Sequence, residues 1–430
     1  MLRSMGGPAG ARGEQLRKPV LDILRGAAIL MVMLRHAWPE VFQGAGIVGV
    51  VLFFVLSGFL ITDVLVRDIQ RHGRIRFGRF YTHRALRLLP ALFAFVIVYV
   101  VVESLTDVLG DRSDGTILLT TVTALTYIKD IPLPFEVSQS IAPLWTLAVE
   151  EQFYLIWPAL LMWAFRRRLT TRLVVVSTAV VLGLMLVSVG TILLIDPDKF
   201  THIYSLPTTW GVGLIAGSAA RIYRHRALAW LGSGRRPPVA WASAIALAGL
   251  CFFPNANATP AFYVLGGPLI VIAGCAAVLA GEQRERKVQF AWPLLYLGKV
   301  SYAAYLWNYL VLLWLNGGSA VGATWWAAWG SICLTLLIAS ASWHTVEQLG
   351  RMGRRRFDGW NEACVSGGSP GNNDSVHGGQ RSNNVQHDVI VPPYGASRAQ
   401  TGQSNFSVED GQGASADGMA RRVDGTDLHK

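Results

Sequence analysis

Residues 21–36 read LDILRGAAILMVMLRH, an apolar stretch in which Arg25 and His36 stand eleven positions apart. A helix turns by about 100° and rises by about 1.5 Å per residue. Both side chains are therefore predicted to lie on one helical face, about 16 Å apart along the axis. An ionisable side chain is costly in the hydrocarbon layer of a membrane and marks a functional position there. The stretch predicts a membrane-spanning helix that carries part of a site.

The rest of the chain is similarly apolar. Of its 430 residues 52% are hydrophobic and 15% are charged, whereas soluble domains carry about 25% charged residues. About ten segments are long and apolar enough to span a membrane. They lie near residues 20–37, 47–66, 88–105, 144–165, 173–195, 207–222, 238–254, 261–281, 294–316 and 324–346. The predicted fold is all-α, a polytopic membrane protein with about ten transmembrane helices.

The charges predict the orientation of these helices. Basic clusters precede the first segment and follow each even-numbered one, among them Arg17-Lys18, Arg166-Arg167-Arg168 and Arg354-Arg355-Arg356. The opposite loops are acidic, with Asp107, Asp130 and Glu136 among their residues. Because Lys and Arg stay on the cytoplasmic side, both termini are predicted to be cytoplasmic, in a multi-pass protein of the plasma membrane. The net charge of +11 follows from this topology, and no nucleic-acid partner is predicted.

Composition also predicts the ends of the chain. Residues 1–19 form a cytoplasmic N-terminal segment, and residues 20–350 form the transmembrane domain. From residue 359 to residue 430 Gly, Ser, Asn and Gln dominate, a composition that buries too little apolar surface to fold. This segment is predicted to be a disordered cytoplasmic tail. The four cysteines have no metal-binding or redox spacing, so no metal site is predicted.

Two further stretches contain charged residues at helical spacing. The stretch FGRFYTHRALRLLP, residues 77–90, places Arg84 and Arg87 on one helical face. Paired guanidinium groups bind phosphates, although arginines at this depth also anchor helices at lipid headgroups. The stretch PLWTLAVEEQFYLIWP, residues 143–158, carries Glu150 and Glu151 into a predicted spanning helix. Two adjacent carboxylates followed by an apolar run predict a functional role.

Four blocks in this order resemble the integral-membrane O-acyltransferases of the acyltransferase-3 family. Leu21 to His36 resembles the family's leading Arg-x10-His motif, and Phe53 to Ile61 resembles its Ser-Gly-Phe-Leu block. The Phe80–Pro90 and Trp145–Tyr154 stretches are similar to its two later blocks. The resemblance covers roughly residues 17–350, and it identifies residues 20–350 as a transmembrane acyltransferase domain.

The chain departs from the family's pattern at a few positions. His83 replaces an arginine, and Thr146 replaces a serine. Asn308 stands where many members have a histidine, and Gln348 where an arginine is common. We assign no role to Asn308 or Gln348 from the sequence.

The resemblance implies a donor and a set of site residues. The donor is acyl-coenzyme A, in the first instance acetyl-coenzyme A, offered from the cytoplasm, and no bound cofactor is expected. His36 is the candidate catalytic base for a hydroxyl nucleophile, with Glu150 and Glu151 orienting His36 or the acceptor. The residues assigned to donor or substrate binding are Arg25, Arg84, Arg87, Ser57, Trp145 and Tyr154.

Three functions remain open from the sequence. The first is O-acylation of a hydroxyl on a cell-envelope glycan, and the second is O-acylation of a secreted natural product such as a macrolide. Both need acyl-coenzyme A, a hydroxyl-bearing acceptor and a lipid bilayer as partners. The third is a membrane transporter or flippase, because polar residues in many spanning helices also suit a translocation pathway.

Overall fold

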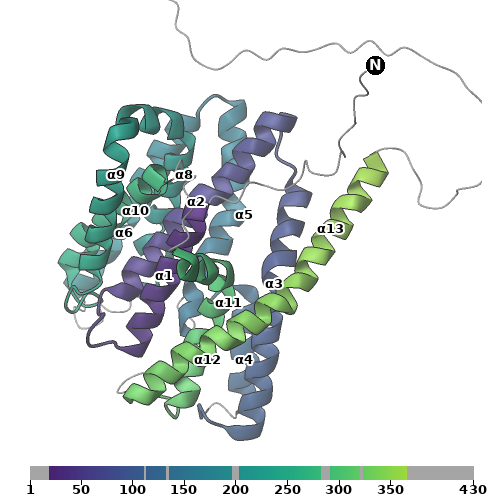
Figure 1. Ribbon diagram of the computed structural model, residues 1–430, viewed down its shortest axis with the longest axis vertical. Helices are drawn as coiled ribbons and strands as arrows, with labels where there is room; N and C mark the ends of the chain where they lie inside the picture. The colour runs from purple at the N-terminus through teal and green to yellow at the C-terminus, as the bar shows by residue number, and fades with distance from the viewer. Residues whose placement is uncertain are drawn as a thin grey trace, which may run out of the picture. The chain divides into compact units, whose positions relative to one another are not determined.

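The computed structural model describes residues 19–110, 113–131, 135–195, 203–281, 291–319 and 323–365, and these residues are helical with no strand among them (Figure 1). They belong to one compact unit, Met1–Pro370. The N-terminal segment before residue 19 and the predicted tail beyond residue 365 lie outside the described residues. The all-α prediction is confirmed for the part of the chain that the structure describes.

Every apolar segment predicted from the sequence coincides with a helix or a pair of helices. In chain order the elements are α1 (Pro19–Ala37), α2 (Ala45–His72), α3 (Phe77–Thr106), α4 (Asp114–Thr126), η1 (Gln139–Leu144), α5 (Trp145–Arg166), α6 (Thr170–Ile195), α7 (Pro207–Trp210), α8 (Val212–Ile222), α9 (Arg224–Leu250), η3 (Phe262–Gly266), α10 (Gly267–Gly281), α11 (Trp292–Leu315), α12 (Trp325–His344) and α13 (Val346–Val365).

Five of the described helical stretches are long and apolar enough to cross a membrane. They are Ala45–His72, Phe77–Thr106, Thr170–Ile195, Phe262–Gly281 and Trp325–Gly359. Helices α1, α5 and α11 are not among them, although α1 and α5 carry predicted site residues. Helices α2 and α3, which carry Ser57, Arg84 and Arg87, are among them. Ten spans and cytoplasmic termini therefore remain predictions.

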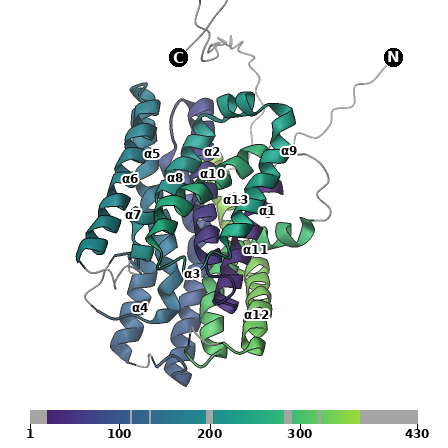
Figure 2. The same cartoon turned by 90° about the vertical axis from the view of Figure 1, so that its left-hand side faces the viewer.

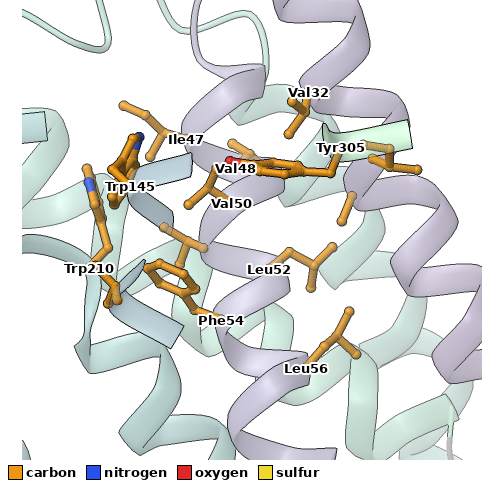
Figure 3. Packing of buried hydrophobic residues seen from close by; sticks show 14 of the residues in the cluster. Val32, Ile47, Val48, Val50, Leu52, Phe54, Leu56, Trp145, Trp210 and Tyr305 are labelled. Carbon is orange, nitrogen blue, oxygen red and sulfur yellow. The ribbon is translucent and has the colours of Figure 1, made fainter. Parts of the chain in front are cut away.

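Helix α2 lies at the centre of the packing. It contacts α1, α5, α8 and α10, and its long apolar run is almost entirely buried. Figure 3 shows Trp145 of α5 and Trp210 of α7 beside Phe54 of α2. The rings of Phe54 and Trp145 meet edge to face, with centroids 6.2 Å apart. The elements that carry the predicted site are thus held around one apolar helix.

Glycines allow a close helix contact between α1 and α11. A Cβ atom on Gly26 would collide with the carbonyl oxygen of Leu294, and one on Gly298 would collide with that of Asp22. Because α1 contacts α11 at Gly26 near its start and at His36 near its end, the two helices run parallel. Small residues let membrane helices approach to backbone contact in this way.

Two described helices have no counterpart in the predicted spans. Helix α4 is a short helix between α3 and α5, and α13 is a long basic helix that packs across α3 (Figures 1 and 2). Gly350 of α13 sits so close to the carbonyl oxygen of Leu86 that a side chain there would collide with it. Helix α13 continues past residue 359, where the tail was predicted to begin; residues 366–430 lie outside the described residues.

The glycine contacts yield a prediction about stability. Gly26→Ala or Gly298→Ala should destabilise the protein by about 1–3 kcal/mol, because the added methyl group meets a backbone oxygen that cannot rotate away. Gly183→Ala in α6 is the matched control, since nothing lies within 4 Å of its added carbon. That control should be neutral or stabilising, because alanine is the better helix former. Thermal unfolding in detergent measures the difference, and equal melting temperatures for all three variants would contradict the prediction.

Candidate functional site

The imidazole of His36 is held by α11. Its Nδ1–H donates to the side-chain oxygen of Asn308 at 2.6 Å, and the ring of Tyr309 lies 5.0 Å away, centroid to centroid. Asn308 is buried, with 1% of its surface exposed. Since Nδ1 is occupied as a donor, the lone pair of the neutral ring is on Nε2. The contact therefore orients His36 as a potential base.

His36 lines a pocket of about 660 Å³, called here the His36 pocket. Its other lining residues come from α1, α11, the starts of α2 and α5, and connecting segments, and they include Arg35, Lys129, Trp145, Tyr204, Tyr305 and Tyr309. Tyr204 lies in a connecting segment, where burial raises the pKa of its hydroxyl to about 12 although Arg35 opposes the shift. The pocket thus combines a candidate base, a neighbouring guanidinium and neutral phenol hydroxyls.

Glu150 belongs to a second group of residues, deeper in the bundle. It accepts a hydrogen bond from the hydroxyl of Ser57 at 2.8 Å and another from Tyr154 at 3.1 Å. Glu150 and Ser57 line a pocket of about 50 Å³, called here the central pocket, together with Arg25. The Nε of Arg25 donates to the hydroxyl of Ser301 on α11 at 3.4 Å.

Glu151 pairs with Arg84 instead of facing the central pocket. The guanidinium donates from Nε to both carboxylate oxygens, at 3.0 and 2.9 Å, and from a terminal nitrogen at 2.5 Å. Arg84 also lies over the ring of Tyr154, 3.4 Å from its centroid. A forked pair of this kind is geometrically specific, and removing one partner leaves a partly buried charge uncompensated.

Arg87 lies one helical turn beyond Arg84 and has different surroundings. It is exposed and lines a pocket of about 300 Å³, called here the arginine pocket. The cationic residues of that pocket are Arg25, Arg67, Arg87, Lys299, Arg351 and Arg354. Its acidic residues are Asp22, Asp63 and Glu347, of which Asp63 already pairs with Arg67 and Arg221. The pocket therefore has an excess of positive charge.

The three pockets adjoin one another along α1. Arg25 and Tyr302 line both the arginine pocket and the central pocket. Val50 and Tyr305 line both the central pocket and the His36 pocket. The pockets form a series from Arg25, near the start of α1, to His36 near its end, and the central pocket is the narrowest part.

Tyr305 forms the wall between the central pocket and the His36 pocket. Its hydroxyl donates to the carbonyl oxygen of Pro143 at 2.9 Å and accepts a hydrogen bond from Thr146 at 2.7 Å. Thr146, which stands where the family has a serine, keeps the hydroxyl that makes this bond. The wall is thus fixed by two hydrogen bonds at the start of α5.

The structure brings together some of the predicted site residues and separates others. His36 lies in one pocket with Trp145, whereas Ser57, Tyr154 and Glu150 cluster around the central pocket. Among the described residues, Glu150 bonds to Ser57 and Tyr154 and Glu151 bonds to Arg84, so the hydrogen bonds found for the two glutamates do not include one to His36. The residue that orients His36 is Asn308, which lies 272 positions further along the chain. No cluster of metal-ligating side chains is found among the described residues.

The sequence profile of a family described as an acyltransferase domain matches residues 19–344. The match begins with α1 and ends with α12. It includes the pocket-lining helices α1, α2, α3, α5, α11 and α12, but not α13, which contributes Glu347, Arg351 and Arg354 to the arginine pocket.

The chain also resembles curated O-acetyltransferases. It is 27% identical over 352 residues to Peptidoglycan O-acetyltransferase OatA of Listeria monocytogenes, an alignment covering 76% of this chain and 55% of that protein. It is 26% identical over 352 residues to O-acetyltransferase OatA of Staphylococcus aureus, covering 76% of this chain and 56% of that protein. The chain spans about half the length of the curated relatives it matches. No solved structure matches it.

The Arg84–Glu151 pair can be tested by a double-mutant cycle. Arg84→Gln and Glu151→Gln should each lower the melting temperature, and the double variant should lose less than the sum of the two losses. We expect a coupling energy of about 0.5–3 kcal/mol, as for side chains that share a contact. Thermal unfolding of the four proteins in one detergent provides the measurement. Strictly additive losses would show that the pair does not stabilise the bundle.

Proposed function

The chain belongs to the acyltransferase-3 family and is an acyltransferase, and on that premise we propose its substrates. We propose that it moves an acetyl group from acetyl-coenzyme A to a hydroxyl of a cell-envelope glycan. The observation that carries the proposal is the series of three adjoining pockets from Arg25 to His36. Membership of an acyltransferase family also argues against the alternative function, a transporter or flippase.

The charges of the arginine pocket support coenzyme A as the donor. Coenzyme A carries phosphates at one end and a thioester at the other, joined by an extended chain. Guanidinium groups bind phosphates through charge-assisted, forked hydrogen bonds. Arg87 and Arg25 would bind the phosphates and polar groups of the donor, whereas Arg84 is already engaged by Glu151. This assignment places the nucleotide at the end of the bundle that the charge pattern predicts to be cytoplasmic.

The size of the central pocket supports a route in which the donor extends from the arginine pocket toward His36. A space of about 50 Å³ is too small for a nucleotide or a sugar but suits a narrow chain. The pantetheine arm would pass beside Arg25 and Ser57, and the thioester would reach His36 past Tyr305. The distance is compatible, because Arg25 and His36 are about 16 Å apart along α1.

The proposed chemistry is a direct transfer. Nε2 of His36 takes the proton of the acceptor hydroxyl as its oxygen bonds to the thioester carbonyl carbon. The carbon–sulfur bond then breaks, and the coenzyme A thiolate leaves with the proton that His36 returns. Arg35 lines the same pocket, and we propose that its guanidinium stabilises the oxyanion of the tetrahedral intermediate. Asn308 keeps the proton of His36 on Nδ1, so that Nε2 stays available.

The names of the relatives support a glycan as the acceptor. The relative from Listeria monocytogenes is named for peptidoglycan, a polymer of the cell envelope. We therefore propose that the hydroxyl acylated by this chain belongs to an envelope glycan, and no observation favours a secreted natural product. Incubating the purified enzyme with labelled acetyl-coenzyme A and peptidoglycan fragments, followed by mass spectrometry, tests the proposal. Label on the fragments supports it, and label only on released acetate contradicts it.

The role of His36 yields a second test. His36→Ala should lower the rate of acetyl transfer by about 10²–10⁴, the usual contribution of a general base. Asn308→Leu should lower kcat less and leave the KM for acetyl-coenzyme A unchanged, and Asn308→Asp, which keeps an oxygen acceptor, should recover part of the rate. Initial rates with intact, correctly inserted protein provide the measurement. A wild-type rate for His36→Ala would remove His36 from the mechanism.

The role of the arginine pocket yields a third test. Arg87→Ala should raise the KM for acetyl-coenzyme A about tenfold with little effect on acceptor affinity, because a charge-assisted phosphate contact is lost. Arg74→Ala is the matched control, since Arg74 is exposed in the segment between α2 and α3 and does not line the pocket. Acetyl-pantetheine, which lacks the nucleotide and all of its phosphates, should bind wild-type and Arg87→Ala proteins equally. An equal rise in KM for both variants would show only a general effect of charge.

A further inference from the structure

A fourth pocket adjoins the His36 pocket and has no part in the mechanism above. It measures about 820 Å³ and shares Lys129 and Ser205 with the His36 pocket. Its described lining residues come from the segment after α3, from α4, from residues 129–131 and 135–140, from α6 and the segment before α7, and from the end of α11 and the segment after it. We call it the Asp130 pocket. Its position beside His36, away from the arginine pocket, makes it a continuation of the acceptor side.

Asp130 is buried in the wall of this pocket with half of its carboxylate engaged. It is 2% exposed, and its Oδ1 accepts a hydrogen bond from the side-chain amide of Gln152 at 3.0 Å. Its Oδ2 has no hydrogen-bond partner among the described residues. The contact with Gln152 therefore satisfies only one of the two carboxylate oxygens of Asp130.

Ser140 repeats this situation in the same pocket. It is 2% exposed, and its backbone N–H donates to the hydroxyl oxygen of Ser138 at 3.1 Å. Its own hydroxyl has no hydrogen-bond partner in the described part of the chain. A buried polar group without a partner costs about 1–3 kcal/mol. Two such groups in the wall of one polar pocket indicate that a ligand completes them.

The chemistry of the two groups limits what the ligand can be. A carboxylate only accepts hydrogen bonds, so the ligand must bring an O–H or N–H donor, and a serine hydroxyl either donates or accepts. The charged residues of the pocket are Lys129, Asp130 and Glu136, which gives no excess of positive charge for a phosphate. Phe135 is also in the wall and is exposed, which offers an apolar surface to a sugar ring. These are the features of a site for a neutral sugar with hydroxyl and acetamido groups.

The ionisation of Asp130 is consistent with a missing donor. Burial raises the pKa of this carboxyl above its ordinary value, and hydrogen bonds from Gln152 and from the backbone of Asp130 itself oppose the shift. A donor from a ligand would favour the charged form further. The neighbouring Lys129 shows the same burial, which lowers the pKa of its ammonium.

We propose that the Asp130 pocket is a glycan subsite that holds the sugar unit next to the one acylated in the His36 pocket, with Asp130 and Ser140 bonding its hydroxyl or acetamido groups. This inference rests on the proposed function for the identity of the acceptor. It adds that the enzyme recognises at least two consecutive sugar units. An oligosaccharide should therefore bind more tightly than the single sugar.

Binding of neutral sugars to the full-length protein in detergent tests the subsite without any acyl transfer. The probes are N-acetylglucosamine and its tetramer, followed by intrinsic tryptophan fluorescence. We expect the tetramer to bind the wild-type protein at least tenfold more tightly than the monomer. Asp130→Asn should lose that advantage, and Ser140→Ala should lose about threefold. Asp107→Asn is the control, an equal loss of charge at an exposed residue that does not line the pocket.

The outcomes distinguish a failure of the proposed subsite from a failure of the proposed acetyl transfer. Equal affinity of the wild-type protein for monomer and tetramer, or unchanged tetramer binding by both Asp130→Asn and Ser140→Ala, overturns the subsite even where acetyl transfer occurs. Binding that depends on Asp130 without acetyl transfer to the tetramer or to peptidoglycan fragments supports the subsite and overturns the proposed reaction. A melting temperature for Ser140→Ala equal to that of the wild type shows that its loss of affinity is not a loss of folding.

Discussion

The close contact between α1 and α11 is the constraint on which the rest of the site depends. Gly26 and Gly298 let the two backbones meet, and this contact fixes which residues of the parallel helices face each other. Arg25 then meets Ser301, and His36 meets Asn308. Polar side chains in an apolar bundle need such partners, because an unpaired polar group is expensive where water is excluded. The glycines therefore stabilise the pairs that the chemistry uses.

Most of the fold could be predicted from the sequence, because long apolar runs in a membrane have few alternatives to helices. The shared face of Arg25 and His36 was also predictable, and both residues do contact α11. Asn308 was not. Its importance comes from a contact between helices far apart in the chain, and hydropathy and spacing contain no information about which helices meet. Helix α13 was not predicted, because it is polar and basic and contains no long apolar run. It packs across α3 instead of forming a separate span.

Glu150 and Glu151 show how adjacency in sequence misleads. Two neighbouring carboxylates suggest a pair that acts together, but consecutive residues of a helix point about 100° apart. Glu150 therefore turns toward Ser57 and the central pocket, and Glu151 turns toward Arg84 on α3. The opposite case is Arg84 and Arg87, which share a face by spacing and yet differ in surroundings. One is neutralised by a carboxylate, and the other is exposed in the arginine pocket.

In the proposed reaction, this distribution of charge would separate the two substrates in space. The excess of cations lies beside Arg87, whereas the His36 pocket and the Asp130 pocket have fewer charged residues and no comparable excess of positive charge. Between them the central pocket is too narrow for a sugar or a nucleotide, and Tyr305 is its wall. In the proposed route, a charged donor and a neutral acceptor enter from opposite ends and meet only where the narrow chain of the donor emerges. That point would be next to His36, and the proposed base would then stand at the one position where both reacting groups are present.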